Sequence, residues 1–231
     1  MICPYSQSKL KQILTIYLNK NYTKVEEASS YIFAEGNCPI CLVAHLDTVF
    51  PFLPGKNEIF YDPHAEVMWS PRGLGADDRA GVAAIIKIIE DKYRPSILFT
   101  LDEETTAEGA IKAITEKLVK PNFKALIELD RKGSEDCVFY ECQNLYFKKF
   151  ISRFGFKEAE GTFSDISVLA PYWNVAAVNL SIGYLYEHSP LEYLNFKWMK
   201  STIEKVEKIL SFEKEIPYFR FYDKERRKMK H

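Results

Sequence analysis

Hydrophobic and polar residues alternate along this chain in two spacings, one typical of helices and one typical of strands. Apolar side chains three and four positions apart predict helices over residues 6–19, 78–93, 106–118, 144–154 and 193–212. Short runs rich in branched and aromatic side chains predict strands over residues 31–33, 40–44, 96–101, 123–129, 137–142 and 175–182. Ser6 is a cap candidate for the first helix, and residues 58–70 predict a hairpin that turns at Asp62-Pro63-His64, where His64 is expected to be exposed.

The order of these elements predicts the fold class. Strands alternate with helices along most of the chain, which predicts an α/β fold: a three-layer α/β/α sandwich with a mixed, largely parallel central sheet. Residues 40–44 are almost wholly apolar, as expected of a strand at the centre of such a sheet. No internal repeat or low-complexity linker divides the sequence, and 47% of its residues are hydrophobic. We therefore expect a single domain over residues 1–231.

Composition narrows the range of partners and compartments. The net charge of −1 gives no basis for binding nucleic acid or an acidic membrane, and the short basic end, 224–231, is expected to be solvated. No apolar run approaches the ~20 residues of a membrane helix, and the first residues lack a signal-peptide pattern, so we expect a cytoplasmic protein. An odd number of cysteines, 5, fits a reducing compartment. Cys38 and Cys41 have C-x-x-C spacing, but we expect buried structural thiols rather than a zinc knuckle or a redox pair.

Acidic residues and histidines follow several of the predicted strands and begin one of the predicted helices. In α/β folds, ligands bind beyond the carboxyl ends of the strands. The residues at such positions are His45 and Asp47 after the second strand, Asp102-Glu103-Glu104 after the third, Asp130 after the fourth, and Glu187-His188 after the strand-like run that ends near Tyr184. A carboxylate pair, Asp77-Asp78, begins the helix that follows two glycines. Solvation alone does not explain this repetition at one end of neighbouring strands.

These residue types suit a two-metal hydrolase. Two divalent, zinc-like ions bind histidine nitrogens and carboxylate oxygens, and one carboxylate bridges them. Such a pair of ions, about 3.5–4 Å apart, lowers the pKa of a shared water and stabilises a tetrahedral oxyanion. A further carboxylate, not bound to metal, must carry the proton of the water to the leaving amine. The chain supplies two strand-end histidines, His45 and His188, and enough carboxylates for both tasks.

The same residues lie in motifs that resemble those of the co-catalytic zinc exopeptidases. The motifs, in family order, are His45-Leu46-Asp47-Thr48-Val49, Gly75-Ala76-Asp77-Asp78-Arg79-Ala80-Gly81, Asp102-Glu103-Glu104, Glu128-Leu129-Asp130 and His188-Ser189-Pro190-Leu191-Glu192. This group holds the aminoacylases, carboxypeptidase G, peptidase T, and the glutamyl and leucyl aminopeptidases. The resemblance implies a fold of the phosphorylase/hydrolase-like kind and two zinc ions per chain, with Co²⁺ or Mn²⁺ as substitutes.

Carried over residue by residue, the resemblance also implies a role for each side chain. The implied zinc ligands are His45 and Asp130 for one ion, Glu104 and His188 for the other, and Asp77 as the bridge between them. Glu103 matches the general base and acid, and Asp47 matches the carboxylate that orients the first histidine. Relatives tend to have a cis peptide after the bridging aspartate. Asp78 is a helix-cap candidate, which is compatible with a supporting role beside the metals.

Two features depart from the pattern of the relatives. Thr105-Thr106-Ala107-Glu108 separates the double glutamate from Gly109, whereas glycine usually follows it closely in relatives. In addition, the segments between His45 and Asp77 and after Asp130 are too short for an inserted lid or dimerisation domain. We therefore expect the bare catalytic domain.

The resulting expectation is a zinc-dependent exopeptidase, most simply an aminopeptidase that releases the N-terminal residue of peptides. Without a lid to bind a substrate carboxylate, recognition of a free α-amine is the simpler scheme. Residues 161–165 occupy the place of a segment that lines the substrate pocket in relatives, so the resemblance implies a substrate contact for Asp165. A homo-oligomer, in which a second subunit covers the rim left without a lid, is compatible with this reading.

Three alternatives stay open. The site could deacylate N-acyl amino acids or act as a carboxypeptidase-type amidohydrolase, which the need for a free amine would distinguish. A catalytically silent relative could keep the fold as a binding module, although the complete ligand set with Glu103 counts against this. Chance caps on a nucleotide-binding sheet form the weakest alternative, because neither G-x-G-x-x-G after the first strand nor a Walker loop occurs.

Overall fold

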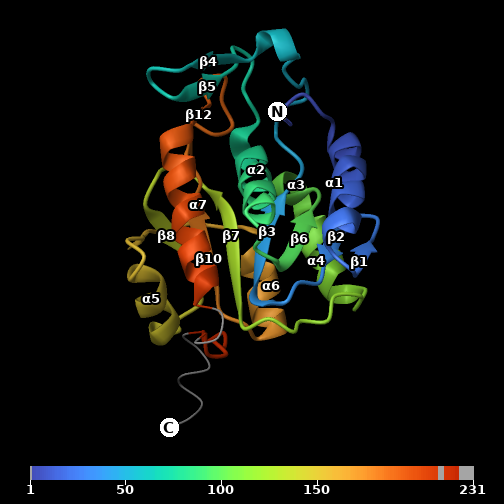
Figure 1. The fold of residues 1–231 in the computed structure, drawn as a ribbon, viewed down its shortest axis with the longest axis vertical. Helices are drawn as coiled ribbons and strands as arrows, with labels where there is room; N and C mark the ends of the chain where they lie inside the picture. The colour runs from blue at the N-terminus through green and yellow to red at the C-terminus, as the bar shows by residue number, and fades with distance from the viewer. Residues whose placement is uncertain (1, 213–215, 224–231) are drawn as a thin grey trace.

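A central sheet of eight strands organises the part of the chain that the computed structural model describes, residues 2–212 and 216–223 (Figure 1). Its strands lie in the order β1 (Val25–Glu27), β2 (Tyr31–Ala34), β6 (Pro95–Thr100), β3 (Cys38–His45), β7 (Ala125–Arg131), β10 (Ala177–Ser181), β8 (Asp136–Val138) and β9 (Lys157–Glu158). The middle strands β6, β3, β7 and β10 are parallel, whereas β2 pairs antiparallel with both of its neighbours and β8 pairs antiparallel with β10. The basic end, 224–231, lies outside the described residues.

Helices cover both faces of this sheet and complete the three layers expected from the sequence (Figure 1). On one face, α2 (Ala76–Glu90) packs against α7 (Phe196–Ser211), and α1 (Gln7–Asn21) contacts α2 through the Tyr17 hydroxyl. On the other face, α4 (Glu108–Thr115) packs against α6 (Asp165–Trp173). The shorter elements are η1 (Lys56–Glu58), α3 (Glu103–Thr106) and α5 (Leu145–Ser152). The α/β/α fold class is therefore confirmed.

A smaller antiparallel sheet lies at the end of the molecule where α2 begins (Figure 1). It contains, in spatial order, β11 (Tyr184–Leu185), β12 (Tyr193–Asn195), β5 (Val67–Trp69) and β4 (Phe60–Asp62). The strands β4 and β5 form the predicted hairpin, and His64 in its turn is exposed as expected. Because β12 pairs with β5, this sheet places the segment after residue 184 beside the segment that leads into α2.

Buried apolar side chains form one continuous cluster around the central sheet. Residues 40–44 are all buried, and β3 lies between β6 and β7, which confirms their predicted central position. All five cysteines belong to this cluster, as expected of structural thiols. Among the described residues, no helix combines the length and the apolar character that crossing a membrane requires.

Several predicted elements differ in the structure. Residues 193–195 form β12, and the last helix begins only at Phe196, because pairing with β5 takes the place of the first helical turn. The strand predicted over 137–142 ends at Val138, and the helix predicted over 106–118 covers only Glu108–Thr115. Helix α6 is not predicted from the sequence, because the internal Pro171 obscures its helical pattern.

Candidate metal centre

The side chains implied as zinc ligands converge at the carboxyl ends of the central strands. They come from five different elements or connections: His45 ends β3, Asp130 lies in β7, Asp77 lies at the start of α2, Glu104 lies in α3, and His188 follows β11. Local sequence places each residue at the end of an element, but only the packing of these elements brings the side chains together.

His45 is buried at the centre of the cluster. Its Nε2 lies 3.2 Å from Oδ1 of Asp77 and 3.5 Å from Oδ1 of Asp130, while its Nδ1 lies 3.2 Å from Oδ1 of Asp47. The Asp47 carboxylate also accepts hydrogen bonds from the backbone amides of Glu103 and Glu104, at 3.2 and 3.0 Å. The Asp47 carboxylate therefore contacts the ring of His45 and the start of α3 at the same time, and its role in orienting a metal-binding histidine stays a prediction.

His188 and Glu104 meet Asp77 on the more open side of the cluster. The Nε2 atom of His188 lies 3.2 Å from Oδ2 of Asp77 and 3.1 Å from Oε2 of Glu104. The two oxygens of Asp77 thus face different histidines, Oδ1 toward His45 and Oδ2 toward His188. A bridging carboxylate needs this arrangement. The His188 side chain is 51% exposed, so this side of the cluster is open to solvent.

Asp78 adjoins the cluster and has backbone partners of its own. The Asp77–Asp78 peptide is cis, as the resemblance implies. Oδ1 of Asp78 accepts a hydrogen bond from the amide of Gly81 at 3.0 Å, and Oδ2 accepts one from the amide of His45 at 3.3 Å. Asp78 therefore caps the regular part of α2 and ties that helix to the end of β3.

The pKa values of these groups reflect a crowd of carboxylates. Burial, together with the negative charge of Asp77, raises the pKa of Asp130 and raises the pKa of Glu104 to about 7. The hydrogen bond between His188 and Asp77 raises the pKa of His188 to about 9. Burial acts to raise the pKa of Asp77 as well, but hydrogen bonds with His188 and then His45 hold it well below its usual range. The mutual repulsion of these acids calls for positive charge at the same place.

Metal ions would supply this positive charge. Arg79, the basic residue within the second motif, directs its guanidinium to backbone carbonyls of the N-terminal segment instead. In two groups of residues, one possible ligand atom of each member lies within 4.8 Å of the others: His45 with Asp77 and Glu104, and His45 with Asp78 and Asp130. Imidazole nitrogens and carboxylate oxygens are the donors that zinc and related ions prefer. The residues present therefore fit a metal centre.

Glu103 lies beside these candidate ligands, but its carboxylate takes no part in the histidine–carboxylate contacts found among the described residues. It is the first residue of α3, directly before Glu104, and its carboxylate has no hydrogen-bond partner within the described part of the chain. Burial, with the negative charges of Asp77 and Asp47, raises the pKa of Glu103. A carboxylate with these properties can accept a proton and release it again.

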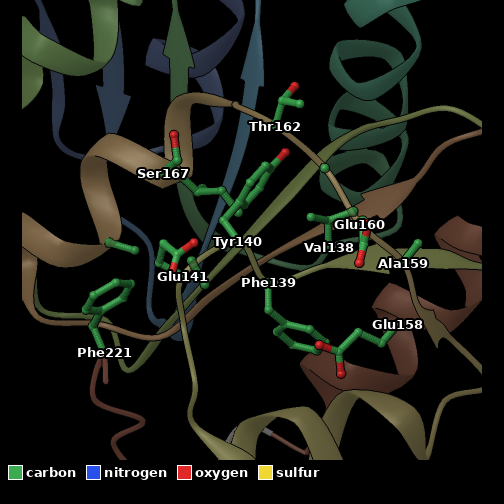
Figure 2. Close-up of a pocket in the computed structure, with 14 residues that line it drawn as sticks. Val138, Phe139, Tyr140, Glu141, Glu158, Ala159, Glu160, Thr162, Ser167 and Phe221 are labelled. Atoms are coloured by element: carbon green, nitrogen blue, oxygen red, sulfur yellow. The ribbon is translucent and has the colours of Figure 1, made fainter. Parts of the chain in front are cut away.

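Asp165 is close to the cluster but is fully buried. It begins α6, and its Oδ2 accepts a hydrogen bond from the hydroxyl of Thr100 at the end of β6. Gly161 and Thr162, from the same predicted segment, instead line a cavity of about 380 Å³ beside Tyr140 (Figure 2). The substrate contact expected of Asp165 stays a prediction.

Other buried side chains support the cluster without having been predicted. Asn179 of β10 clamps the backbone of Asp130: its Oδ1 accepts from the Asp130 amide at 2.9 Å, and its Nδ2 donates to the Asp130 carbonyl at 2.8 Å. The Tyr184 hydroxyl donates to Oδ1 of Asp130 at 3.1 Å. Glu192 accepts hydrogen bonds from the turn that carries Asp77. The place of Glu192 in the fifth motif was a usable signal, whereas no local pattern marks Asn179 or Tyr184.

Comparison with known proteins gives matches among solved structures alone. No protein-family model matches the chain, and no curated protein sequence does. The chain is similar to a tripeptidase from Staphylococcus aureus, with a TM-score of 0.71 and 14% identity, covering 89% of this chain and 92% of that one. It is also similar to aminopeptidase PepT from Bacillus cereus, with a TM-score of 0.70 and 15% identity, covering 90% and 94%.

A third similar structure is the TET1 peptidase from Pyrococcus horikoshii, described as assembling into a tetrahedron or a large octahedral shell. The TM-score is 0.63 and the identity 13%, covering 90% of this chain and 95% of that one. Identities this low establish the fold. The chain has the α/β/α fold of these peptidases, as the resemblance of its motifs implied.

Proposed function

We propose that this protein is a zinc-dependent aminopeptidase, which hydrolyses the N-terminal peptide bond of peptides. The observation that carries the proposal is the convergence of two histidines with Asp77, Asp130 and Glu104, which is next to Glu103 in the sequence and at the start of α3. The names of the structural neighbours, a tripeptidase and an aminopeptidase, support the same reaction class.

The residues that would hold the ions divide into two sets around one bridge. His45 and Asp130 would hold one ion, Glu104 and His188 the other, and Asp77 would lie between them. When bound, two zinc ions supply Lewis acidity, since they lower the pKa of a water and stabilise negative charge on oxygen. Co²⁺ and Mn²⁺ accept the same donors and are the expected substitutes.

Glu103 would move the proton of the reaction. Its carboxylate accepts a proton from water as the water oxygen bonds to the scissile carbonyl carbon, and returns it to the amide nitrogen as the carbon–nitrogen bond breaks. One water is consumed, and the products are a free amino acid and a shortened peptide. The raised pKa of Glu103, caused first by burial, suits a group that must both take and give a proton. Asp47 would hold Glu103 in place through its backbone amide.

A free α-amine is the substrate feature that this site would recognise. The connections 46–76 and 131–187 contribute strands and helices to the two sheets and their covering layers, and no separate lid domain interrupts them in the described residues. The surrounding carboxylates favour a cationic amine. The chain would act as a bare catalytic domain in the cytoplasm. It would form a homo-oligomer, a state supported by the Pyrococcus neighbour, which assembles into a tetrahedron or a large octahedral shell.

Metal content and substrate preference together test this proposal. Elemental analysis of the purified protein is expected to find close to two zinc ions per chain, and a chelator is expected to stop the cleavage of aminoacyl amides. Cleavage of N-acetylaminoacyl amides alone would move the assignment to a deacylase. No metal, even after zinc is added back, would overturn the proposed chemistry and favour a binding module.

Glu103→Gln separates the chemistry from metal binding. The variant is expected to keep both ions and to lose about 10²- to 10⁴-fold in kcat, because the amide cannot carry the proton. Glu108→Gln makes the same change on the neighbouring helix, where Glu108 pairs with Lys112 on the surface, and is expected to keep full activity. Near-wild-type rates for Glu103→Gln would show that the assigned mechanism is wrong.

A further inference from the structure

Glu192 has an unusual set of partners for a buried acid. Its side chain is 0% exposed, and its carboxylate accepts hydrogen bonds from three backbone amides of one turn. Oε2 accepts from Leu74 and Ala76, each at 3.0 Å, and Oε1 accepts from Asp77 at 3.1 Å. Hydrogen bonds from amides to a carboxylate are among the stronger ones in proteins, and here they all end on the segment that carries the bridging aspartate.

The turn can present these amides because its glycines adopt conformations that other residues avoid. Gly73 has a φ of +92° and Gly75 a φ of +67°, both in the left-handed region. Successive amides then point to one side and form a concave anion site, which also adjoins the N-terminal end of α2. The Glu192 carboxylate fills this site from within the chain, so it is an internal anchor.

A compact turn fixes Glu192 relative to His188. The amide of Glu192 donates to the carbonyl of Ser189 at 3.0 Å. The Ser189 hydroxyl donates to the carbonyl of Tyr186 at 2.8 Å and accepts from the amide of Leu191 at 3.2 Å. The orientation of His188 and the position of the Glu192 carboxylate are therefore set by the same turn.

These contacts close a loop of interactions around Asp77. The Glu192 carboxylate holds the amide of Asp77, and His188 contacts the Asp77 carboxylate at 3.2 Å. We infer that Glu192 is a positioning residue that fixes Asp77 and His188 together in the geometry that binds metal. This inference rests on the proposed function, because it assigns Glu192 a task at the same metal centre.

Glu192→Gln is the sharpest change because it keeps the size of the side chain. A carboxylate offers two accepting oxygens to the three amides, whereas a carboxamide offers one oxygen and turns its NH₂ group toward at least one amide donor. The turn must then shift, and Asp77 shifts with it. Loss of such a supporting contact is expected to weaken metal binding by about 10- to 100-fold.

The experiment titrates Co²⁺ into the full-length protein after its metal has been removed by chelation. Visible absorption reports the coordination of the ion, and calorimetry reports the stoichiometry and affinity; neither needs turnover. The control is Glu204→Gln, which makes the same change at an exposed position of α7. The wild-type protein and this control are each expected to bind two ions and to give the same absorption spectrum. Glu192→Gln is expected to bind at least about tenfold more weakly and to give a changed spectrum.

A milder variant covers the case in which Glu192→Gln does not fold. Ser189→Ala removes the two hydrogen bonds of the Ser189 hydroxyl and leaves the Glu192 carboxylate in place, so it is expected to weaken Co²⁺ binding by a smaller factor and to shift the spectrum in the same direction. Two ions bound by the folded variants with wild-type affinity and spectrum would overturn the inference and leave the proposed function standing. A wild-type protein that binds no metal would overturn both.

Discussion

The ligands of the candidate metal centre fall into two groups that are held in place by different means. His45 and Asp130 lie at the ends of the neighbouring parallel strands β3 and β7, whose register is fixed by the backbone ladder and by buried apolar side chains. Asp77, Glu104 and His188 lie outside the central sheet, at the start of α2, in the short helix α3 and in a loop. The strand group is positioned mainly by the core, with added support for Asp130 from Asn179 and Tyr184, whereas the loop group is positioned by polar anchors.

The anchors of the loop group are buried carboxylates that accept backbone hydrogen bonds. Glu192 holds the turn before α2, and Asp47 holds the first residues of α3. Hydrogen bonds are directional, and a buried group that loses its partner costs about 1–3 kcal/mol. The strand ligands and the loop ligands should therefore respond differently to mutation. Damage to the core should unfold the protein, whereas damage to the anchors should release metal from a folded protein.

The largest effect is expected from Asp77→Asn, which alters the residue of the loop group that we propose as the bridge between the two ions. Loss of one charged ligand atom at a shared position should lower the affinity for both ions. It should also lower kcat/KM by roughly 10³-fold, since metal stabilisation of charge is worth several kcal/mol. The metal-free variant should still fold but melt at a lower temperature than the wild type, because it loses the contacts with His188 and His45 that hold the pKa of Asp77 below its usual range. Elemental analysis and calorimetry test this. Two tightly bound ions in the variant would contradict the role of Asp77.

Leu42→Ala tests how the core supports the strand group of ligands, because Leu42 is buried in β3 near His45. A cavity in the core is expected to lower the free energy of unfolding by about 2–5 kcal/mol. The number of ions bound per folded chain should not change. Denaturant unfolding measures the first quantity and metal analysis the second. Ile16→Ala, at a position that is 59% exposed, is the control and should change stability by less than about 0.5 kcal/mol. A Leu42→Ala variant that stays stable but loses metal would show that the core and the anchors do not have the separate roles described above.

A smaller effect is expected from Gly73→Ala, which strains the turn that Glu192 holds. Alanine in the left-handed region costs about 1–2 kcal/mol, and its Cβ would lie 2.2 Å from the ring of Phe50, which must move. Gly55→Ala is the matched control, because Gly55 has a φ of −65° and its added Cβ would meet the nearest side chain only at 3.4 Å. Thermal melting with and without metal should show a loss for Gly73→Ala alone. Equal midpoints for both variants would show that this turn tolerates a shift.

Local sequence was enough to predict the elements that depend on local physics. The Ser6 side chain caps α1 as expected, because its hydroxyl accepts from the amide of Lys9 within the same turn. Residues 40–44 lie at the centre of the sheet because a wholly apolar strand must be covered on both faces. The candidate ligands were found through motifs, each of which is local. These predictions needed no knowledge of distant partners.

The missed elements depend on partners that are distant in the sequence. Residues 193–195 continue a helical pattern, but pairing with β5 more than a hundred positions earlier makes them a strand. Asp165 is polar, yet α6 packs it beneath the sheet end against Thr100. Asn179 lies in an apolar strand, and its clamp on Asp130 exists only because β10 lies beside β7. No local pattern could reveal such contacts.

The sequence by itself determined which side chains this protein has for metal chemistry and at the end of which element each one lies. Hydrophobic periodicity and capping act over a few residues, and motifs are equally short, so both can be recognised along the chain. Only the tertiary structure decided how those side chains meet: that the oxygens of Asp77 face two histidines, and that Glu192 fills the turn before α2. Those contacts join segments brought together by burial of the common core, and burial acts on the whole chain at once.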